Sequence, residues 1–128
     1  MELWKNEQTM KIHSRVVDGI TILDMNGRIT LGEDTSALRS AIAGLIADKR
    51  NTILLNMHAV PYIDSSGLGE LVAAFTNVRN SGGELKLLNL SAKVRTLLEI
   101  TRLLTFFDVK EDETVALHSF AAPLADPR

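Results

Sequence analysis

The stretch TILLNMHAVPYIDSSGLG, residues 52–69, decides the fold because its hydrophobic pattern changes along its length. It contains the continuous apolar run Ile53-Leu54-Leu55, which is typical of a short strand buried on both faces. After a loop at residues 58–64, helical spacing begins near Ser66. The apolar residues at that spacing are Leu68, Leu71, Val72, Phe75 and Val78. The stretch therefore predicts a buried strand followed by an amphipathic helix.

Further toward the N-terminus, the pattern predicts an antiparallel hairpin. Residues 10–17 alternate between apolar and polar side chains, and residues 20–25 form a second expected strand. The apolar side of the first strand consists of Met10, Ile12 and Val16. The Asp18-Gly19 pair between the strands is a strong turn signal, because glycine tolerates positive φ.

A helix is expected between this hairpin and the buried strand. Its apolar residues at helical spacing are Leu38, Ile42, Leu45 and Ile46. Asp34 or Thr35 is the expected N-cap, since either side chain offers an oxygen to free backbone N–H groups. The helix should end near Lys49-Arg50, where cations suit the negative pole of its dipole. A strand, a helix and a strand in this order imply a right-handed crossover.

On the C-terminal side, Asn80-Ser81-Gly82-Gly83 ends the second helix, and residues 84–90 predict another strand. Ser91 then caps a third helix. The residues of that helix expected to face the core are Val94, Leu97, Leu98 and Thr101. Residues 106–109 are expected as a short edge strand, and residues 112–120 as a last helix.

Together these elements predict an α/β fold in which a mixed sheet of four to five strands packs against about four helices. The expected organisation is a lead-in at residues 1–9, one domain at residues 10–120 and a tail at residues 121–128. A length of 128 residues suits one compact domain with its own core.

Composition excludes several classes of protein. The formal net charge of -2 indicates no broad basic face for nucleic acid. No apolar run is long enough to cross a membrane, and the first residues do not resemble a signal peptide. Without cysteine, a disulfide scaffold or thiolate metal site is impossible, and this is compatible with a reducing cytoplasm. No motif calls for a cofactor.

The candidate functional segment is Val60 to Gly69, between the buried strand and the helix that follows it. Partner and ligand sites of α/β proteins tend to lie at such carboxyl ends of strands. Asp64, Ser65 and Ser66 can each cap a helix. Gly67 and Gly69 are poor helix formers, so their presence indicates a tight turn or a close approach to the backbone.

Local chemistry leaves two interpretations open. The first is a well-capped helix and nothing more. The second is a phosphoacceptor serine beside a helix N-terminus. A phosphate adds roughly -1.5 to -2 charges, and the positive pole of the helix tolerates that charge. Phosphorylation would then act on a partner's surface and leave the fold intact.

Two other chemistries fit poorly. An esterase needs G-x-S-x-G around its serine, but Ile63 precedes Ser65 by two residues and Asp64 precedes Ser66 by two. The three histidines, His13, His58 and His118, are expected at the surface rather than as catalytic bases. Nucleotide binding through a P-loop is not supported, because the chain has no G-x-x-x-x-G-K-[S/T] motif. The sequence therefore predicts a binding protein and not an enzyme.

The segment Tyr62-Ile63-Asp64-Ser65-Ser66-Gly67-Leu68-Gly69 resembles the STAS-domain family, specifically the bacterial anti-sigma factor antagonists. The resemblance extends over roughly residues 10–120. It is reinforced by the segments at residues 82–90 and 94–98.

This resemblance implies a switch between partners. Its phosphoacceptor is the serine directly after the motif aspartate, here Ser65, with Ser66 as the alternative. The segment from Tyr62 to Gly69 would bind an anti-sigma factor with serine kinase activity. The unphosphorylated form binds that factor and frees the sigma factor for transcription. A phosphatase acting on the phosphoserine resets the switch.

One segment departs from the family pattern. Such antagonists often carry Gly-Glu-Leu/Ile-Asp after the second strand, whereas this chain has Gly27-Arg28-Ile29-Thr30. The segment from Arg28 to Thr30 therefore lacks two acidic residues of the family pattern, which leaves the choice of partner open. The alternative function is a STAS interaction scaffold in another signalling complex, without control by phosphorylation.

Overall fold

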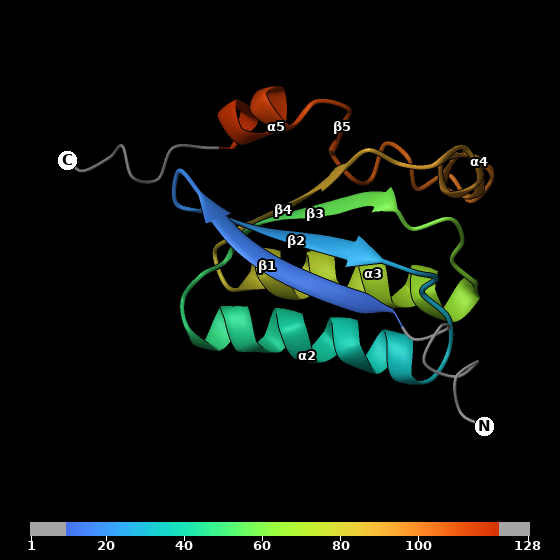
Figure 1. The fold of residues 1–128 in the computed structure, drawn as a ribbon, viewed down its shortest axis with the longest axis horizontal. Helices are drawn as coiled ribbons and strands as arrows, with labels where there is room; N and C mark the ends of the chain where they lie inside the picture. The colour runs from blue at the N-terminus through green and yellow to red at the C-terminus, as the bar shows by residue number, and fades with distance from the viewer. Residues whose placement is uncertain (1–9, 121–128) are drawn as a thin grey trace.

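The computed structural model describes residues 10–120, and in this part of the chain five strands and four helices are present (Figure 1). In chain order these are β1 Lys11–Val17, β2 Ile20–Asn26, α2 Glu33–Ala47, β3 Thr52–Ala59, α3 Ser65–Asn80, β4 Glu84–Leu88, α4 Ala92–Ile100, β5 Val109–Lys110 and α5 Glu113–Ser119. The predicted mixed sheet with about four helices is confirmed. The expected lead-in, residues 1–9, and tail, residues 121–128, lie outside the described residues.

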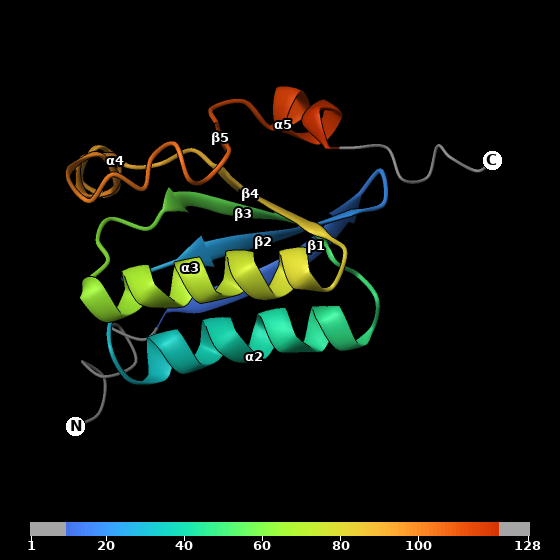
Figure 2. The same ribbon diagram turned by 180° about the vertical axis from the view of Figure 1, so that it is seen from behind.

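The strands lie in chain order across one sheet, from β1 at one edge to β5 at the other. β1 and β2 form the predicted antiparallel hairpin, while β2 to β5 run parallel. The helices α2 and α3 connect successive parallel strands and cover the same face of the sheet (Figures 1 and 2). Successive right-handed connections between adjacent strands place both helices on one face.

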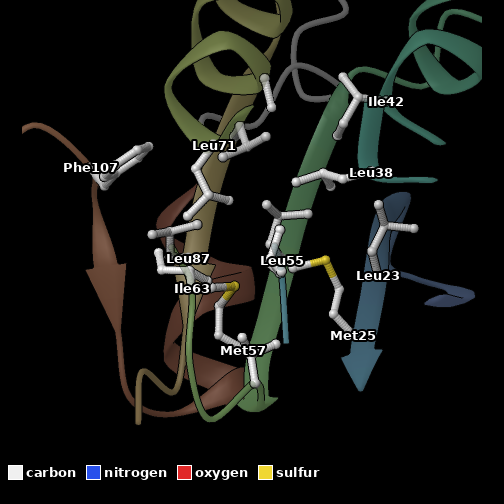
Figure 3. Close-up of a cluster of buried hydrophobic side chains, with 14 of the residues drawn as sticks. Leu23, Met25, Leu38, Ile42, Leu55, Met57, Ile63, Leu71, Leu87 and Phe107 are labelled. Carbon is white, nitrogen blue, oxygen red and sulfur yellow. The ribbon is translucent and has the colours of Figure 1, made fainter. Parts of the chain in front are cut away.

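The main core lies between this face and the two helices (Figure 3). Leu23, Leu55 and Leu87 are register partners on β2, β3 and β4, and together they form a buried row across the sheet. The buried apolar residues that the helices add are Leu38, Ile42, Leu71, Ala74 and Val78. Helical spacing therefore predicted most of this interface, although it missed Ala74.

The helix α5 covers the opposite face of the sheet (Figure 2). Its apolar cluster consists of Ile20, Ile22, Leu54, Leu88, Ala116 and Phe120. Two cations fasten the helix at its ends. Arg15 binds Glu113 at 2.8 Å and Asp24 at 2.6 Å, and Nζ of Lys86 donates to the carbonyl of Ser119 at 2.9 Å. With helices on both sides, β3 is buried on both faces, as its sequence predicted.

The predicted N-cap of α2, Asp34 or Thr35, is wrong. The N-cap is Gly32, so the helix begins earlier than expected, and no side chain caps it. Asp34 instead points into the protein, where its carboxylate accepts from the N–H of Met10 at 3.0 Å and from the hydroxyl of Thr30 at 2.9 Å. The side chain that local sequence assigned to a cap is therefore used to hold β1 against the loop before α2.

Three other predictions on the fold need correction. Val16 is 54% exposed, because its end of β1 extends beyond the main core. Thr101 is exposed as the C-cap of α4 rather than facing the core. The edge strand comprises Val109 and Lys110 instead of residues 106–109, since hydrogen-bonded turns extend from Leu98 to Phe107.

Candidate functional site

The predicted site lies where the chain leaves β3 and enters α3 (Figure 1). Beyond the ends of β2 and β3, the following loops still pair through a parallel bridge between Ile29 and Ile63. Ile29 donates its N–H to the carbonyl of Tyr62 at 3.1 Å and accepts from the N–H of Asp64 at 3.3 Å. Both isoleucine side chains are buried. The two loops therefore form one hydrogen-bonded base under the start of α3.

Asp64 joins this base to the helix. As the N-cap of α3, its Oδ1 accepts from the N–H of Gly67 at 2.8 Å. Its Oδ2 accepts from the N–H of Leu31 at 3.1 Å. The Gly67 N–H, with the Leu31 N–H, lowers the pKa of the Asp64 carboxyl despite some opposing desolvation, because both bonds favour the charged form. A single carboxylate thus ties α3 to the loop after β2.

Ser65 is the first residue of α3 and is exposed, whereas Ser66 is half-buried. Of the three capping candidates in the sequence, Asp64 takes that role. N–H groups in the first turn of a helix lack partners within the helix and carry its positive pole. A group added to the Ser65 hydroxyl would therefore remain at the surface, close to this pole.

The two glycines of the segment differ. A Cβ on Gly67 would collide with the carbonyl oxygen of Ile29, so the first turn of α3 sits directly against the loop after β2. A Cβ on Gly69 would meet nothing within 4 Å. The sequence suggested a close approach to the backbone at both glycines. Within the domain, another segment approaches closely only at Gly67.

The remaining residues of the segment divide between core and surface. Leu68 is half-buried against the main core, while Tyr62 is 45% exposed. Leu31, whose N–H donates to Asp64, is the most exposed of the large apolar residues in the described part of the chain, at 76%. Sequence reasoning missed Leu31 because its bond to Asp64 joins residues far apart in the chain. The available signal was an apolar residue beside Gly32 in a loop.

Other chemistry is not assembled around the serines. Within residues 10–120, no histidine hydrogen-bonds to Ser65, and no group of three or more His, Cys, Asp or Glu side chains is placed to hold a metal ion. None of the helices described between these limits has the length and apolar character needed to span a membrane.

A family profile, that of the STAS domain, matches residues 11–116. The chain belongs to the STAS domain family. It is 26% identical over 115 residues to the putative anti-sigma factor antagonist BtrV of Bordetella bronchiseptica, covering 90% of this chain and 98% of that protein. It is also 38% identical over 64 residues to the anti-sigma-B factor antagonist of Bacillus subtilis, a match over 50% of this STAS chain and 59% of its relative.

Solved structures agree on the STAS fold. A putative anti-sigma factor antagonist from Thermotoga maritima superposes with a TM-score of 0.79 at 24% identity, over 85% of this chain and 93% of that one. The anti-sigma factor antagonist SpoIIAA in its unphosphorylated form gives a TM-score of 0.64 at 20% identity, over 84% and 96% of the two chains. At these identities the likeness establishes the fold.

We expect Gly67→Ala to destabilise this STAS domain by about 1–3 kcal/mol, because the added methyl overlaps the Ile29 backbone and the tight packing must shift. Gly69→Ala is the matched control. It places the same methyl in open space and should raise stability by about 0.5–1 kcal/mol through helix propensity. Urea unfolding of the three proteins measures both effects. Equal effects of the two substitutions would contradict the assigned contact.

Asp64→Ala should cost about 1 kcal/mol of unfolding free energy at neutral pH, the usual cost of a lost N-cap. Because folding lowers the pKa of Asp64, this stabilisation is fully present above the unfolded value of about 3.9 and is lost as pH falls through the folded pKa. Urea unfolding between pH 7 and pH 3 should therefore show the two proteins converging in acid.

Asp64→Asn controls for charge, because an amide retains one oxygen for Gly67 but cannot accept from both N–H groups. Its loss at pH 7 should be smaller than that of Asp64→Ala. A difference between wild type and Asp64→Ala that persists undiminished in acid would show that the charge of Asp64 contributes nothing.

Proposed function

We propose that this chain is an anti-sigma factor antagonist whose binding to an anti-sigma factor is switched by phosphorylation of Ser65. The observation that carries the proposal is the exposed Ser65 at the start of α3, directly after a capping aspartate whose carboxylate accepts from the first turn of α3 and from the loop after β2. The names of the relatives, anti-sigma factor antagonists, support the class of partner. Ser66 is the less favourable acceptor, because it is half-buried.

The electrostatics of the site favour an effect on binding over an effect on folding. The positive pole of α3 compensates part of the charge of a phosphate on Ser65. The ionised Asp64 lies next to it, so the phosphorylated surface would carry a concentrated negative charge. A partner that fits the neutral serine would have to desolvate this charge, which is costly unless it is paired. Phosphorylation therefore releases the partner and leaves the domain folded.

The proposed partner is an anti-sigma factor that also acts as a serine kinase on Ser65. In the unphosphorylated state the antagonist occupies this factor, and the sigma factor is free to direct transcription. A phosphatase restores the serine and with it the binding. All these steps take place in the cytoplasm, and the antagonist itself catalyses none of them.

The loop from Arg28 to Thr30 lies under this surface through the Ile29 contacts. Because it lacks the acidic residues frequent in this class, we expect it to influence which anti-sigma factor is bound. A scaffold of another signalling complex, without phosphorylation, is the competing function.

The decisive test uses Ser65→Ala, Ser65→Asp and Ser66→Ala in a pull-down from the source organism, with the bound kinase identified and purified. Ser65→Ala should bind this kinase like wild type but accept no phosphate, whereas Ser66→Ala should still be phosphorylated. Ser65→Asp should bind at least tenfold more weakly, while its melting temperature stays within a degree or two of wild type, as expected for a surface substitution.

If mass spectrometry located the phosphate on Ser66, the phosphoacceptor would be Ser66 instead of Ser65. A Ser65→Asp protein that binds the kinase as tightly as wild type would favour the scaffold over the switch.

A further inference from the structure

The edge of the sheet at β4 is only partly covered, because β5 is short and pairs with the end of β4 alone. At the start of β4, the N–H of Glu84 donates to Asn51 at 2.9 Å, on the side of β3. Further along, the N–H of Leu87 donates to Asp108 at 3.0 Å, on the side of β5. Since backbone groups alternate in direction along a strand, those of Leu85 point to the side that β5 does not reach.

The backbone of Leu85 therefore lacks a partner on that side. The residue packs into the main core and is 3% exposed. Within residues 10–120, no group accepts from its N–H or donates to its carbonyl. Buried backbone groups are nearly always paired, because an unpaired one costs free energy. An open edge of this kind is also a template on which an extended segment can add a strand.

A groove of about 320 Å³ lies along this edge, and Phe75 and Arg79 of α3 line it together with Leu85, Lys86 and Asp108. The ring of Phe75 packs against two further aromatic rings. The guanidinium of Arg79 lies 5.5 Å from the centre of the Phe75 ring, and no carboxylate in the described part of the chain pairs with it. The groove thus combines open backbone groups with an apolar surface and a cation.

The described part of the chain ends at the wall of this groove. Nζ of Lys86 donates to the carbonyl of Ser119 at 2.9 Å and lies 5.1 Å from the centre of the Phe120 ring. β5 ends opposite Leu88, so α5 has brought the chain back along β4 toward the start of that strand. Residues 121–128 are therefore tethered beside the groove. A short tether gives a segment an effective concentration in the millimolar range.

The sequence of this tethered segment, AAPLADPR, complements the groove. Leu124 and Asp126 are two residues apart, so in a strand their side chains share one face. With that face toward α3, the N–H of Leu124 can point at β4. Pro123 and Pro127 then occupy the alternate positions, where the absent N–H would face away from the sheet. Proline is tolerated there on an edge strand, and it discourages a further strand from pairing.

We propose that residues 121–128 add a short antiparallel strand to the open edge of β4. Leu124 lies opposite Leu85, exchanges both backbone hydrogen bonds with it and packs its side chain against Phe75. The added strand covers the edge that would otherwise be free to pair with a second copy of the chain. It does not depend on the phosphorylation of Ser65.

The register of this strand also pairs the cation of the groove. Asp126 stands opposite Gly83, because the two strands of an antiparallel pair run in opposite directions. Gly83 lies against the end of α3, since its N–H donates to the carbonyl of Val78 at 2.9 Å. Arg79 is the next residue of that helix, and the carboxylate of Asp126 pairs with its guanidinium. Arg79 thereby gains the partner that residues 10–120 do not supply.

Two NMR measurements on the full chain test the strand. Nuclear Overhauser contacts should join the methyl groups of Leu124 to the ring of Phe75. Deuterium exchange of the Leu85 amide should be slow, because its hydrogen bond to Leu124 protects it. Leu124→Ser should remove the contacts and speed this exchange roughly tenfold, as expected when a leucine anchor is lost.

Ala125→Ser is the matched control for Leu124→Ser. Its side chain faces away from Phe75 in the proposed strand, so both measurements should remain as in wild type. The amide chemical shifts of β2 and β3 should be unchanged in both variants, which checks that the domain is folded. Equal effects of the two substitutions on the Leu85 amide would overturn the proposed strand.

The ion pair is tested by reversing its charges. Asp126→Arg and Arg79→Asp should each speed exchange of the Leu85 amide by about two- to fivefold, the range for exposed ion pairs. The double variant restores the attraction with opposite signs, so its exchange should return toward the wild-type rate. Single effects that simply multiply in the double variant would overturn the proposed register.

A mixture of isotope-labelled and unlabelled chains identifies the occupant of the groove. Contacts between Leu124 and Phe75 of the same chain support the proposal. Contacts that form only between chains would assign the edge to a second copy and overturn it. A wild-type Leu85 amide that exchanges as fast as in Leu124→Ser, without any contact to Phe75, would also overturn it and leave the edge open to another protein. None of these measurements involves Ser65, so the proposed switch stands or falls separately.

Discussion

The burial of β3 on both faces is the constraint on which the rest of the structure depends. Ile53, Leu54 and Leu55 are successive residues whose side chains alternate between the faces, and all three are fully buried. One face must therefore be covered by α2 and α3, and the other by α5. Since burying a leucine contributes roughly 1.5–3 kcal/mol, a strand of this composition is stable only inside such a sandwich of helices.

The same strand places the site. When β3 ends at Ala59, the chain has to reach the start of α3 on the covered face, and the loop that makes this turn lies beside the loop leaving β2. Asp64 then closes the arrangement by accepting from Gly67 on one side and Leu31 on the other. Core packing thus places the exposed Ser65 at the start of α3, where hydrogen bonds to the loop after β2 hold the helix terminus. A charge added at this point changes the surface without entering the core.

Local patterns predicted what depends on neighbouring residues. The hairpin turn at Asp18-Gly19, the apolar spacing of Leu38 and Ile42, and the cap at Ser91 were all expected and are present. The cap of α2 was mispredicted because Asp34 has the right chemistry for a cap but is used elsewhere. Its carboxylate binds Met10, which lies 24 residues away in the chain. A tertiary hydrogen bond of this kind leaves no signal in the residues around Asp34.

The sequence by itself determined the order of elements, the burial of β3 and the presence of a capped helix start with two serines at its head. These follow from side-chain periodicity and capping chemistry, which act over a few residues. Only the tertiary structure decided that Asp64 is the cap, that Gly67 is required by the backbone of Ile29 while Gly69 is not, and that Leu31 is bonded to Asp64. These depend on contacts between the loops after β2 and β3, and the sheet alone brings those loops together.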